Sequence, residues 1–307
     1  MTSNEPSSPP SKACLARKPS WLRRPLPKGP VFGRTKGLLR DLRLNTVCDG
    51  ANCPNRSECY DRGVAAFLIL GRVCTRNCAF CNITPGVPEP VDEQEPDRLA
   101  RAAARLGLGH VVVTSVSRDD LPDGGAGHFA AVLGALRQAL PEATLEVLIP
   151  DFGGDSDSLQ TVLDARPDVL NHNLETVPEL YAAVRPQAGY ARSLKLLARA
   201  KQAAPGGLTK SGLMLGLGET PDQVRRVLAD LAAARCDIVT MGQYLAPSAG
   251  HAPIDRYAAP QEFDAWAAYG LSLGIPSMHC APLVRSSYNA GRFVEAGEGR
   301  ARGHDGG

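Results

Sequence analysis

The sequence predicts an α/β fold built around a parallel sheet of six strand–helix units. Between residues 64 and 274, short runs of leucine and β-branched residues alternate with stretches rich in alanine and leucine, which is typical of βα units. Successive units are spaced by roughly 30 to 40 residues, which fits right-handed crossovers between parallel strands. Six units are fewer than the eight of a closed barrel, so the pattern fits either an incomplete barrel or a doubly wound sheet.

Each predicted strand is followed by a predicted helix, although a long loop precedes the first helix. Thr220 followed by Pro221 supports one helix start, because a threonine N-cap and a proline at the first helical position both favour an N-terminus. Residues 18–44 lack a sustained period and are expected to form an arm on the main domain. Strands are expected at residues 66–70, 109–114, 144–149, 168–171, 212–216 and 237–242, and helices at residues 97–106, 128–140, 156–165, 191–203, 220–234 and 261–273.

The composition indicates an ordinary folded chain and excludes several classes of partner. Hydrophobic residues make up 43% of the 307 residues and charged residues 21%, and the net charge of +2 is spread without a basic block that would bind nucleic acid. The longest apolar run, residues 64–71, is far shorter than the roughly 20 residues that span a membrane. Residues 1–12 are polar and lack the apolar stretch of a secretory signal. We therefore expect a cytoplasmic protein with no nucleic-acid or membrane partner, and a disordered tail over residues 1–16.

The cysteines carry the strongest indication of chemistry. Because cytosolic thiols stay reduced, the nine cysteines are not expected to form a disulfide framework. Cys74, Cys78 and Cys81, called the first triad below, follow the first predicted strand in a C-x3-C-x2-C run. A four-iron cluster normally has four cysteine ligands, so three would leave one iron open to a substrate or cofactor. A structural zinc loop is the alternative, but such sites usually draw paired ligands from two separated halves, so the spacing favours iron and sulfur.

A second group of three cysteines precedes the first predicted strand. Cys48, Cys53 and Cys59, called the second triad below, form a C-x4-C-x5-C run. The two triads could share one site, but each is compact and they flank the strand at residues 66–70, which favours two clusters. The other cysteines are scattered, and since free cysteine is often buried they are expected to be structural or incidental: Cys14, Cys236 and Cys280.

The two triads together resemble a known enzyme family. The first triad, with Phe80 before its last cysteine, resembles the radical S-adenosylmethionine superfamily, whose members carry this run after the first strand of a partial six-unit barrel. The second triad is similar to the auxiliary-cluster motif of the lipoyl synthase family. The resemblance covers about residues 17–293 and includes the segments 18–23, 118–125, 171–176, 210–219, 242–245 and 285–288. Positions that depart from the family pattern are Ser117, Ala252 and Ala281.

The resemblance implies a more specific architecture than the pattern alone. It implies a partial (β/α)6 TIM-type barrel over residues 64–274. An N-terminal extension over residues 17–63 would carry the auxiliary-cluster motif. A C-terminal extension over residues 275–307 would carry a serine ligand motif and a flexible end. The two extensions would cover the opening of the barrel.

The resemblance also implies roles for individual residues. The first triad would hold a 4Fe–4S cluster whose open iron binds S-adenosylmethionine, and the second triad would hold another 4Fe–4S cluster. A serine of residues 285–288 would be the fourth ligand of that second cluster, and Ser287 is favoured because the family tolerates threonine at the position of Ser286. Asn173 and Glu175 are similar to residues that contact S-adenosylmethionine, and Arg185 is expected to assist them.

The implied reaction is the insertion of two sulfur atoms at carbons six and eight of a protein-bound octanoyl-lysine, with the auxiliary cluster as sulfur donor. No side chain can ionise such carbon–hydrogen bonds at neutral pH, so a cofactor must carry the step. The implied partners are an octanoylated lipoyl carrier domain, an electron donor of ferredoxin or flavodoxin type, and an iron–sulfur carrier that rebuilds the cluster. Two alternatives remain: an enzyme similar to biotin synthase, against which the second triad argues, and an electron-transfer protein with two clusters and no catalysis.

Overall fold

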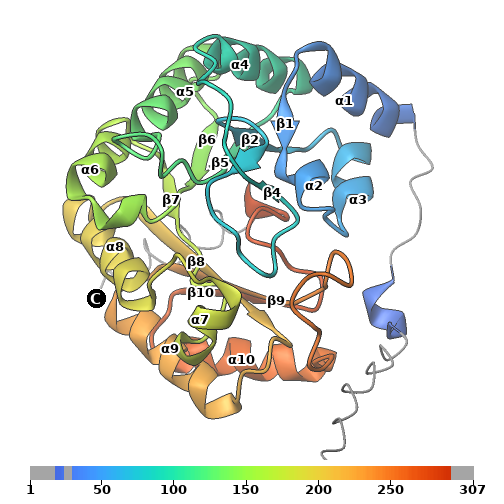
Figure 1. Cartoon of the computed structure of the whole chain (residues 1–307), viewed down its shortest axis with the longest axis vertical. Coiled ribbons are helices and arrows are strands. Elements are labelled where there is room, and N and C mark those ends of the chain that lie inside the picture. Colours follow the sequence, from blue (N-terminus) through green and yellow to red (C-terminus); the bar gives the residue numbers. More distant parts are fainter. Residues whose placement is uncertain (1–17, 24–29, 292–307) are drawn as a thin grey trace, which may run out of the picture.

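The computed structural model describes residues 18–23 and 30–291. The tail predicted over residues 1–16, with Cys14, and the flexible end predicted after residue 297 lie outside the described residues. The described chain forms a curved sheet whose convex side is ringed by helices, as Figure 1 shows. None of the helices in the described ranges is long and apolar enough to cross a membrane.

A single curved sheet of eight strands forms the frame of the described residues, in the order β1-β2-β5-β6-β7-β8-β9-β10. Only β1 pairs antiparallel with its neighbour, β2, and the other neighbouring strands are parallel. Because the strand order follows the chain without reversing, the doubly wound alternative is excluded. The strands are β1 (Asn45–Thr46), β2 (Ala66–Ile69), β5 (His110–Ser115), β6 (Thr144–Leu148), β7 (Val169–Asn171), β8 (Leu208–Leu215), β9 (Ile238–Gln243) and β10 (Ser277–Cys280), and a separate pair is formed by β3 (Val73–Cys74) and β4 (Thr84–Pro85).

Helices connect successive parallel strands, and the six predicted between residues 97 and 273 are confirmed. The predicted start of α9 is also confirmed, because Thr220 and Gln223 form a reciprocal capping box there. The helices are α1 (Pro30–Asp41), α2 (Val47–Gly50), α3 (Arg56–Asp61), α4 (Glu95–Leu106), α5 (Ala126–Ala139), α6 (Ser156–Asp164), α7 (Tyr181–Val184), α8 (Tyr190–Ala203), α9 (Pro221–Ala233) and α10 (Pro260–Ser272), with 3-10 turns η1 (Ser20–Leu22), η2 (Phe152–Gly154) and η3 (Pro178–Leu180).

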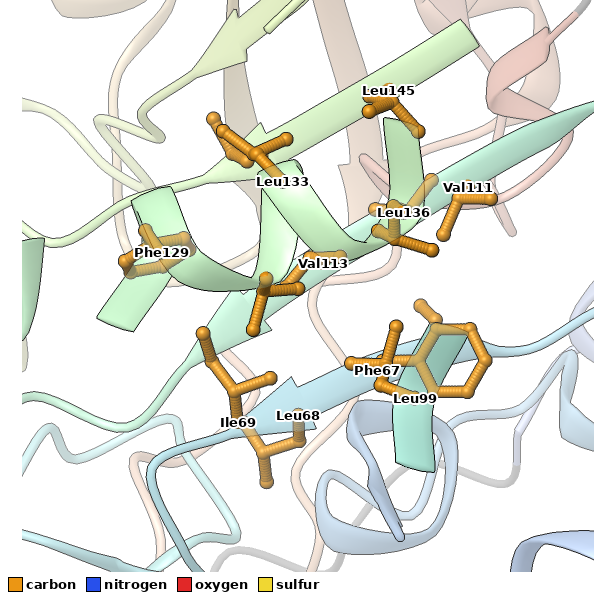
Figure 2. Close-up of a cluster of buried hydrophobic side chains, with 14 of the residues drawn as sticks. Phe67, Leu68, Ile69, Leu99, Val111, Val113, Phe129, Leu133, Leu136 and Leu145 are labelled. Carbon is orange, nitrogen blue, oxygen red and sulfur yellow. The ribbon is translucent and has the colours of Figure 1, made fainter. Parts of the chain in front are cut away.

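Along the strands, successive side chains face alternately the hydrophobic core beneath the outer helices and the interior that the curved sheet encloses. Phe67 and Ile69 of β2 pack with Val111 and Val113 of β5 against side chains of α4 and α5, such as Leu99, as Figure 2 shows. Because successive residues of a strand face opposite sides, their neighbours point into the interior. The inward-facing residues of the same two strands are Ala66, Leu68, Val112 and Thr114.

The structure contains elements that were not predicted, α1 and β10 among them, and its strand β8 is longer than expected. Residues 30–41 form α1, where an arm without regular structure was expected. Strand β8 begins at Leu208 and not at residue 212. Its first residues carry polar side chains, which ion pairing and hydrogen bonds make it possible to bury. A further strand, β10, pairs with β9 although its four residues include serine and histidine. Hydrophobic periodicity does not detect such polar strands.

Candidate functional site

A cavity of about 500 Å³ opens at the carboxyl ends of the strands, where ligands bind in folds of this class. Its walls come from the interior of the sheet, the loop after β2, the short helices before β2 and the segment after β10. Cys59 does not line the cavity, but the other cysteines of both triads do. The remaining predicted site residues also line it: Asn173, Glu175, Arg185, Ser286 and Ser287.

The first triad lies on one loop that leaves β2 and is shaped around the Cys74 thiol. The sulfur of Cys74 accepts hydrogen bonds from the backbone N–H groups of Arg76, at 3.4 Å, and Ser117, at 3.3 Å. Hydrogen bonds to cysteine sulfur stabilise thiolate ligands and tune iron–sulfur clusters. The amide of Cys81 donates to the carbonyl of Cys78 at 3.0 Å, which turns the loop back on itself.

A buried ion network braces the same loop. Arg76 is 7% exposed and donates to Asp119 at 2.7 Å and to Asp151 at 2.6 Å. The hydrogen bond from Arg76 holds the pKa of Asp119 below its ordinary value. Burial alone would raise the pKa of Asp151, but hydrogen bonding and charge from Arg76 outweigh it and hold that pKa low. Sequence reasoning missed this network, and its one available signal was an arginine between two cysteines of the triad.

The loop is also clamped by segments that follow later strands. The amide of Ala79 donates to the carbonyl of Val184 in α7 at 2.9 Å. From the loop after β9, Ala252 donates to the carbonyl of Ala79 at 2.8 Å, and the His251 ring lies 3.1 Å from the carbonyl oxygen of Cys81. The position of the first triad is therefore set by the barrel itself.

Burial determines the protonation state of several thiols in the two triads. Burial raises the pKa of Cys48 and that of Cys81 to about 12, and it raises the pKa of Cys78 in the same direction. These thiols are therefore protonated without a metal, and metal binding releases their protons. Across residues 18–23 and 30–291, no three His, Cys, Asp or Glu side chains gather around a single point, as the ligands of one zinc ion would. Three cysteine thiols in each triad are donors of the kind that hold iron–sulfur clusters.

Polar residues at the end of β7 form the opposite wall. Glu175 has a positive φ of 65°, which is costly for a residue other than glycine. Hydrogen bonds of 2.8 Å to β8, from Glu175 to the carbonyl of Gly212 and from Met214 to the carbonyl of Glu175, hold it there. The Asn173 amide donates to the Glu175 carboxylate at 3.0 Å. Burial raises the pKa of Glu175, although Arg185 opposes the shift.

Arg185 lies behind this wall. Its Nη1 donates to the carbonyls of Asn173, at 2.9 Å, and Leu174, at 3.0 Å, and its guanidinium lies over the Tyr181 ring at 5.4 Å. Its Nε is buried and has no hydrogen-bond partner within the described residues. A carboxylate with a raised pKa and a buried cation at one cavity wall suit a ligand that carries both acidic and basic groups.

The second triad lies on α2, α3 and the turn between them, against the segment that follows β10. The Asn55 amide donates to the carbonyl of Leu283 at 2.7 Å, and the Tyr288 hydroxyl donates to Glu58 at 2.8 Å. These contacts join positions more than 220 residues apart in the sequence. The second site is therefore assembled from the two ends of the described chain.

The two adjacent serines of this segment differ in their surroundings. The Ser286 hydroxyl donates to Asn173 Oδ1 at 2.9 Å, so it is engaged with the end of β7. Ser287 follows it in the cavity lining.

Two cysteines that were expected to be incidental do not line the cavity. Cys236 is buried, and its thiol lies within hydrogen-bond distance of the carbonyls of Thr209 and Ile238. Cys280 ends β10.

The chain is similar in sequence and in fold to proteins that are already known. The family model described as the Radical SAM superfamily matches residues 68–231. Lipoyl synthase of Nitratidesulfovibrio vulgaris is 59% identical over 284 residues, which cover 92% of this chain and 95% of that protein. Lipoyl synthase of Oleidesulfovibrio alaskensis is 57% identical over 295 residues, or 96% of this chain and 99% of that protein. The crystal structure of HydG, a maturase of the [FeFe]-hydrogenase, shares the fold at 12% identity, with a TM-score of 0.54 over 80% of this chain and 65% of that one.

Proposed function

We propose that this chain, which belongs to the lipoyl synthase family of the radical S-adenosylmethionine superfamily, converts protein-bound octanoyl groups into lipoyl groups. The reaction inserts two sulfur atoms at carbons six and eight of an octanoyl-lysine, which makes the protein a radical S-adenosylmethionine sulfurtransferase. One observation carries the proposal: thiols of both triads and the polar end of β7 face one cavity. Radical formation and sulfur donation can then act on the same substrate chain.

The residues of the cavity fit the groups that this reaction needs. The first triad would hold a 4Fe–4S cluster, and the second triad with Ser287 would hold another. When bound, the clusters and S-adenosylmethionine supply one-electron chemistry able to break an unactivated carbon–hydrogen bond, together with the sulfur that is inserted. Asn173 and Glu175 would contact the bound S-adenosylmethionine, with Arg185 fixing the backbone carbonyl of Asn173.

The interior of the sheet would receive the octanoyl chain. Apolar side chains from neighbouring parallel strands contribute to its lining there, which suits an alkyl chain and excludes water from the reacting carbons. The residues that form this surface include Leu68, Val112 and Leu148.

Ser287 is the serine that we assign to the second cluster. The Ser286 hydroxyl already donates to Asn173, on the side of β7. On the other side of the segment, contacts such as Tyr288 to Glu58 hold it against the second triad. An alkoxide is a poorer partner for iron than a thiolate, so a serine ligand would be released more easily as the cluster gives up sulfur.

The organisation of the chain follows from these assignments. Residues 64–274 would form a partial (β/α)6 barrel, and residues 17–63 and 275–307 would be extensions that cover its opening. Support comes from the cavity lining, to which residues 47–54 and 284–287 both contribute. The partners would be an octanoylated lipoyl carrier domain, a ferredoxin- or flavodoxin-type electron donor and an iron–sulfur carrier. The protein would act in the cytoplasm, where thiols stay reduced.

An anaerobic reconstitution tests this function. The full chain is loaded with iron and sulfide, reduced, and mixed with S-adenosylmethionine and an octanoylated carrier-domain peptide. We expect about eight irons per chain, as two four-iron clusters require, with 5′-deoxyadenosine and a peptide that gains two sulfurs by mass spectrometry. Nucleoside without sulfur gain would retain the radical enzyme and contradict the substrate, and no nucleoside under strong reduction would contradict the radical reaction.

A further inference from the structure

Ser286 is tied to the barrel through its carbonyl oxygen and its hydroxyl. Its carbonyl oxygen accepts a 2.6 Å hydrogen bond from the Lys210 ammonium, which is fully buried and paired with Glu146 at 2.7 Å. Its hydroxyl donates to Asn173 Oδ1 at 2.9 Å and lies 3.4 Å from the Thr240 hydroxyl. A residue of the segment after β10 is thus held by side chains from β8, β9 and the end of β7, and the β8 side chain is itself paired with Glu146 of β6.

The direction of these hydrogen bonds is determined by chemistry. A carboxylate only accepts hydrogen bonds, so the Asn173 NH₂ must face Glu175, which lies 3.0 Å away. The amide oxygen of Asn173 then points to Ser286, which must donate. Ser286, Asn173 and Glu175 therefore form one polar chain in which the orientation of each group depends on the next.

Two glycines of the sheet leave room for the hydrogen-bonded chain and for the segment after β10. A Cβ atom at Gly212 of β8 would lie 2.7 Å from the Ser286 hydroxyl and 2.8 Å from Asn173 Oδ1. At Gly242 of β9, a Cβ atom would collide with the carbonyl oxygen of Val284. Both glycines are required by close approach of the segment and not by an unusual backbone angle.

The opposite side of the same segment contacts the second triad. Tyr288 donates to Glu58, Arg62 donates to Asn289 at 2.9 Å, and Asn55 donates to Leu283. The short stretch of residues 283–289 therefore touches the S-adenosylmethionine wall on one side and the second-triad helices on the other.

We propose that Ser286, anchored by Lys210, is a positioning residue that couples S-adenosylmethionine binding at Asn173 and Glu175 to the seating of residues 283–289 on the second triad. The identity of the ligand rests on the proposed function. The path of the coupling is the chain of hydrogen bonds from Glu175 through Asn173 to Ser286. A ligand that fixes Asn173 and Glu175 also fixes the acceptor of Ser286, so it holds the segment in place. By linkage, a segment that is well seated strengthens the binding of that ligand by the same factor.

The test compares ligand affinity and segment protection in the anaerobically reconstituted full chain. In the wild type, S-adenosylmethionine should slow backbone hydrogen exchange in residues 283–289 by about five- to tenfold, within the usual range of coupling between sites. Ser286→Ala should abolish this added protection and weaken S-adenosylmethionine binding, measured by equilibrium dialysis, by a similar factor. Ser277→Ala is the matched control, because it removes a buried hydroxyl that contacts His279 and lies outside the cavity lining.

Two further variants approach the coupling from opposite sides. Gly212→Ala should separate Ser286 from Asn173 and reproduce the effect of Ser286→Ala. Tyr288→Phe loosens the segment at Glu58, away from the ligand, and should also weaken S-adenosylmethionine binding. Wild-type protection with unchanged affinity in both Ser286→Ala and Gly212→Ala would overturn the coupling while leaving the proposed function intact. A wild-type chain that binds no S-adenosylmethionine would overturn the proposed function instead.

Discussion

The two triads both contribute thiols to one cavity, but they are held in place by different means. The first triad lies within eight residues of one loop, and Arg76 of that loop pairs with Asp119 and Asp151, which follow strands of the sheet. The second triad depends on contacts with a segment more than 220 residues away, through Asn55 and Tyr288. The first site is thus a product of the barrel, whereas the second requires both ends of the described chain. We therefore expect a substitution that disrupts one triad to leave the other triad able to bind its cluster.

The largest expected effect comes from removing one cysteine of each triad in turn. Cys78→Ala should abolish both 5′-deoxyadenosine formation and sulfur insertion, because S-adenosylmethionine would lose its site of cleavage. Cys53→Ala should retain nucleoside formation and lose sulfur insertion. Each variant should hold about four irons, the content of one cluster. Nucleoside production and sulfur gain are measured in the same reaction at saturating S-adenosylmethionine, and equal loss of nucleoside in both variants would contradict the separate assembly of the two clusters.

The next effect concerns the buried ions that brace the first triad. Arg76→Met leaves the carboxylates of Asp119 and Asp151 facing each other without their shared cation. We expect a loss of about 3 kcal/mol in the free energy of unfolding, at the low end for a broken buried pair, because Arg192 still contacts Asp151. Urea denaturation of the iron-free chain measures it.

Arg192→Met is the control for that variant. Arg192 contacts the same Asp151 carboxylate at 3.1 Å, but its side chain is 39% exposed. Its removal should cost less than about 1 kcal/mol, as expected for an exposed pair. Equal losses in the two variants would show that Arg76 has no special role in bracing the loop.

The same contrast explains what sequence reasoning could and could not find. The first triad and the strand before it were predictable because ligand spacing and apolar runs are local patterns. The start of β8 was missed because Lys210 reads as polar, and only its pairing with Glu146 on β6 makes burial of its charge tolerable. The Ser286 contact with Asn173 joins residues 113 apart, and no local pattern in one sequence reports it.

Secondary structure shows the same division. The helices that carry a 3.6-residue apolar period, such as α4 and α9, were predicted, since that period is visible in a single segment. The short elements β1 and β10 were not, because two to four residues define no period. These elements are strands only because their backbones pair with a neighbouring strand, β2 for β1 and β9 for β10.

The smallest expected effect concerns the contact that joins the second triad to the segment after β10. Asn55→Ala removes the 2.7 Å hydrogen bond to Leu283, but it also removes a buried amide oxygen that has no partner among the described residues. These contributions oppose each other, so we expect a loss of only about 1 kcal/mol in the free energy of unfolding. Hydrogen exchange in residues 283–289 should nevertheless rise. Asn82→Ala, which removes an exposed hydrogen bond to Gly50, should leave exchange there unchanged. If Asn55→Ala also left it unchanged, the second site would not depend on this contact, and the difference between the two triads would be smaller than their sequence separation suggests.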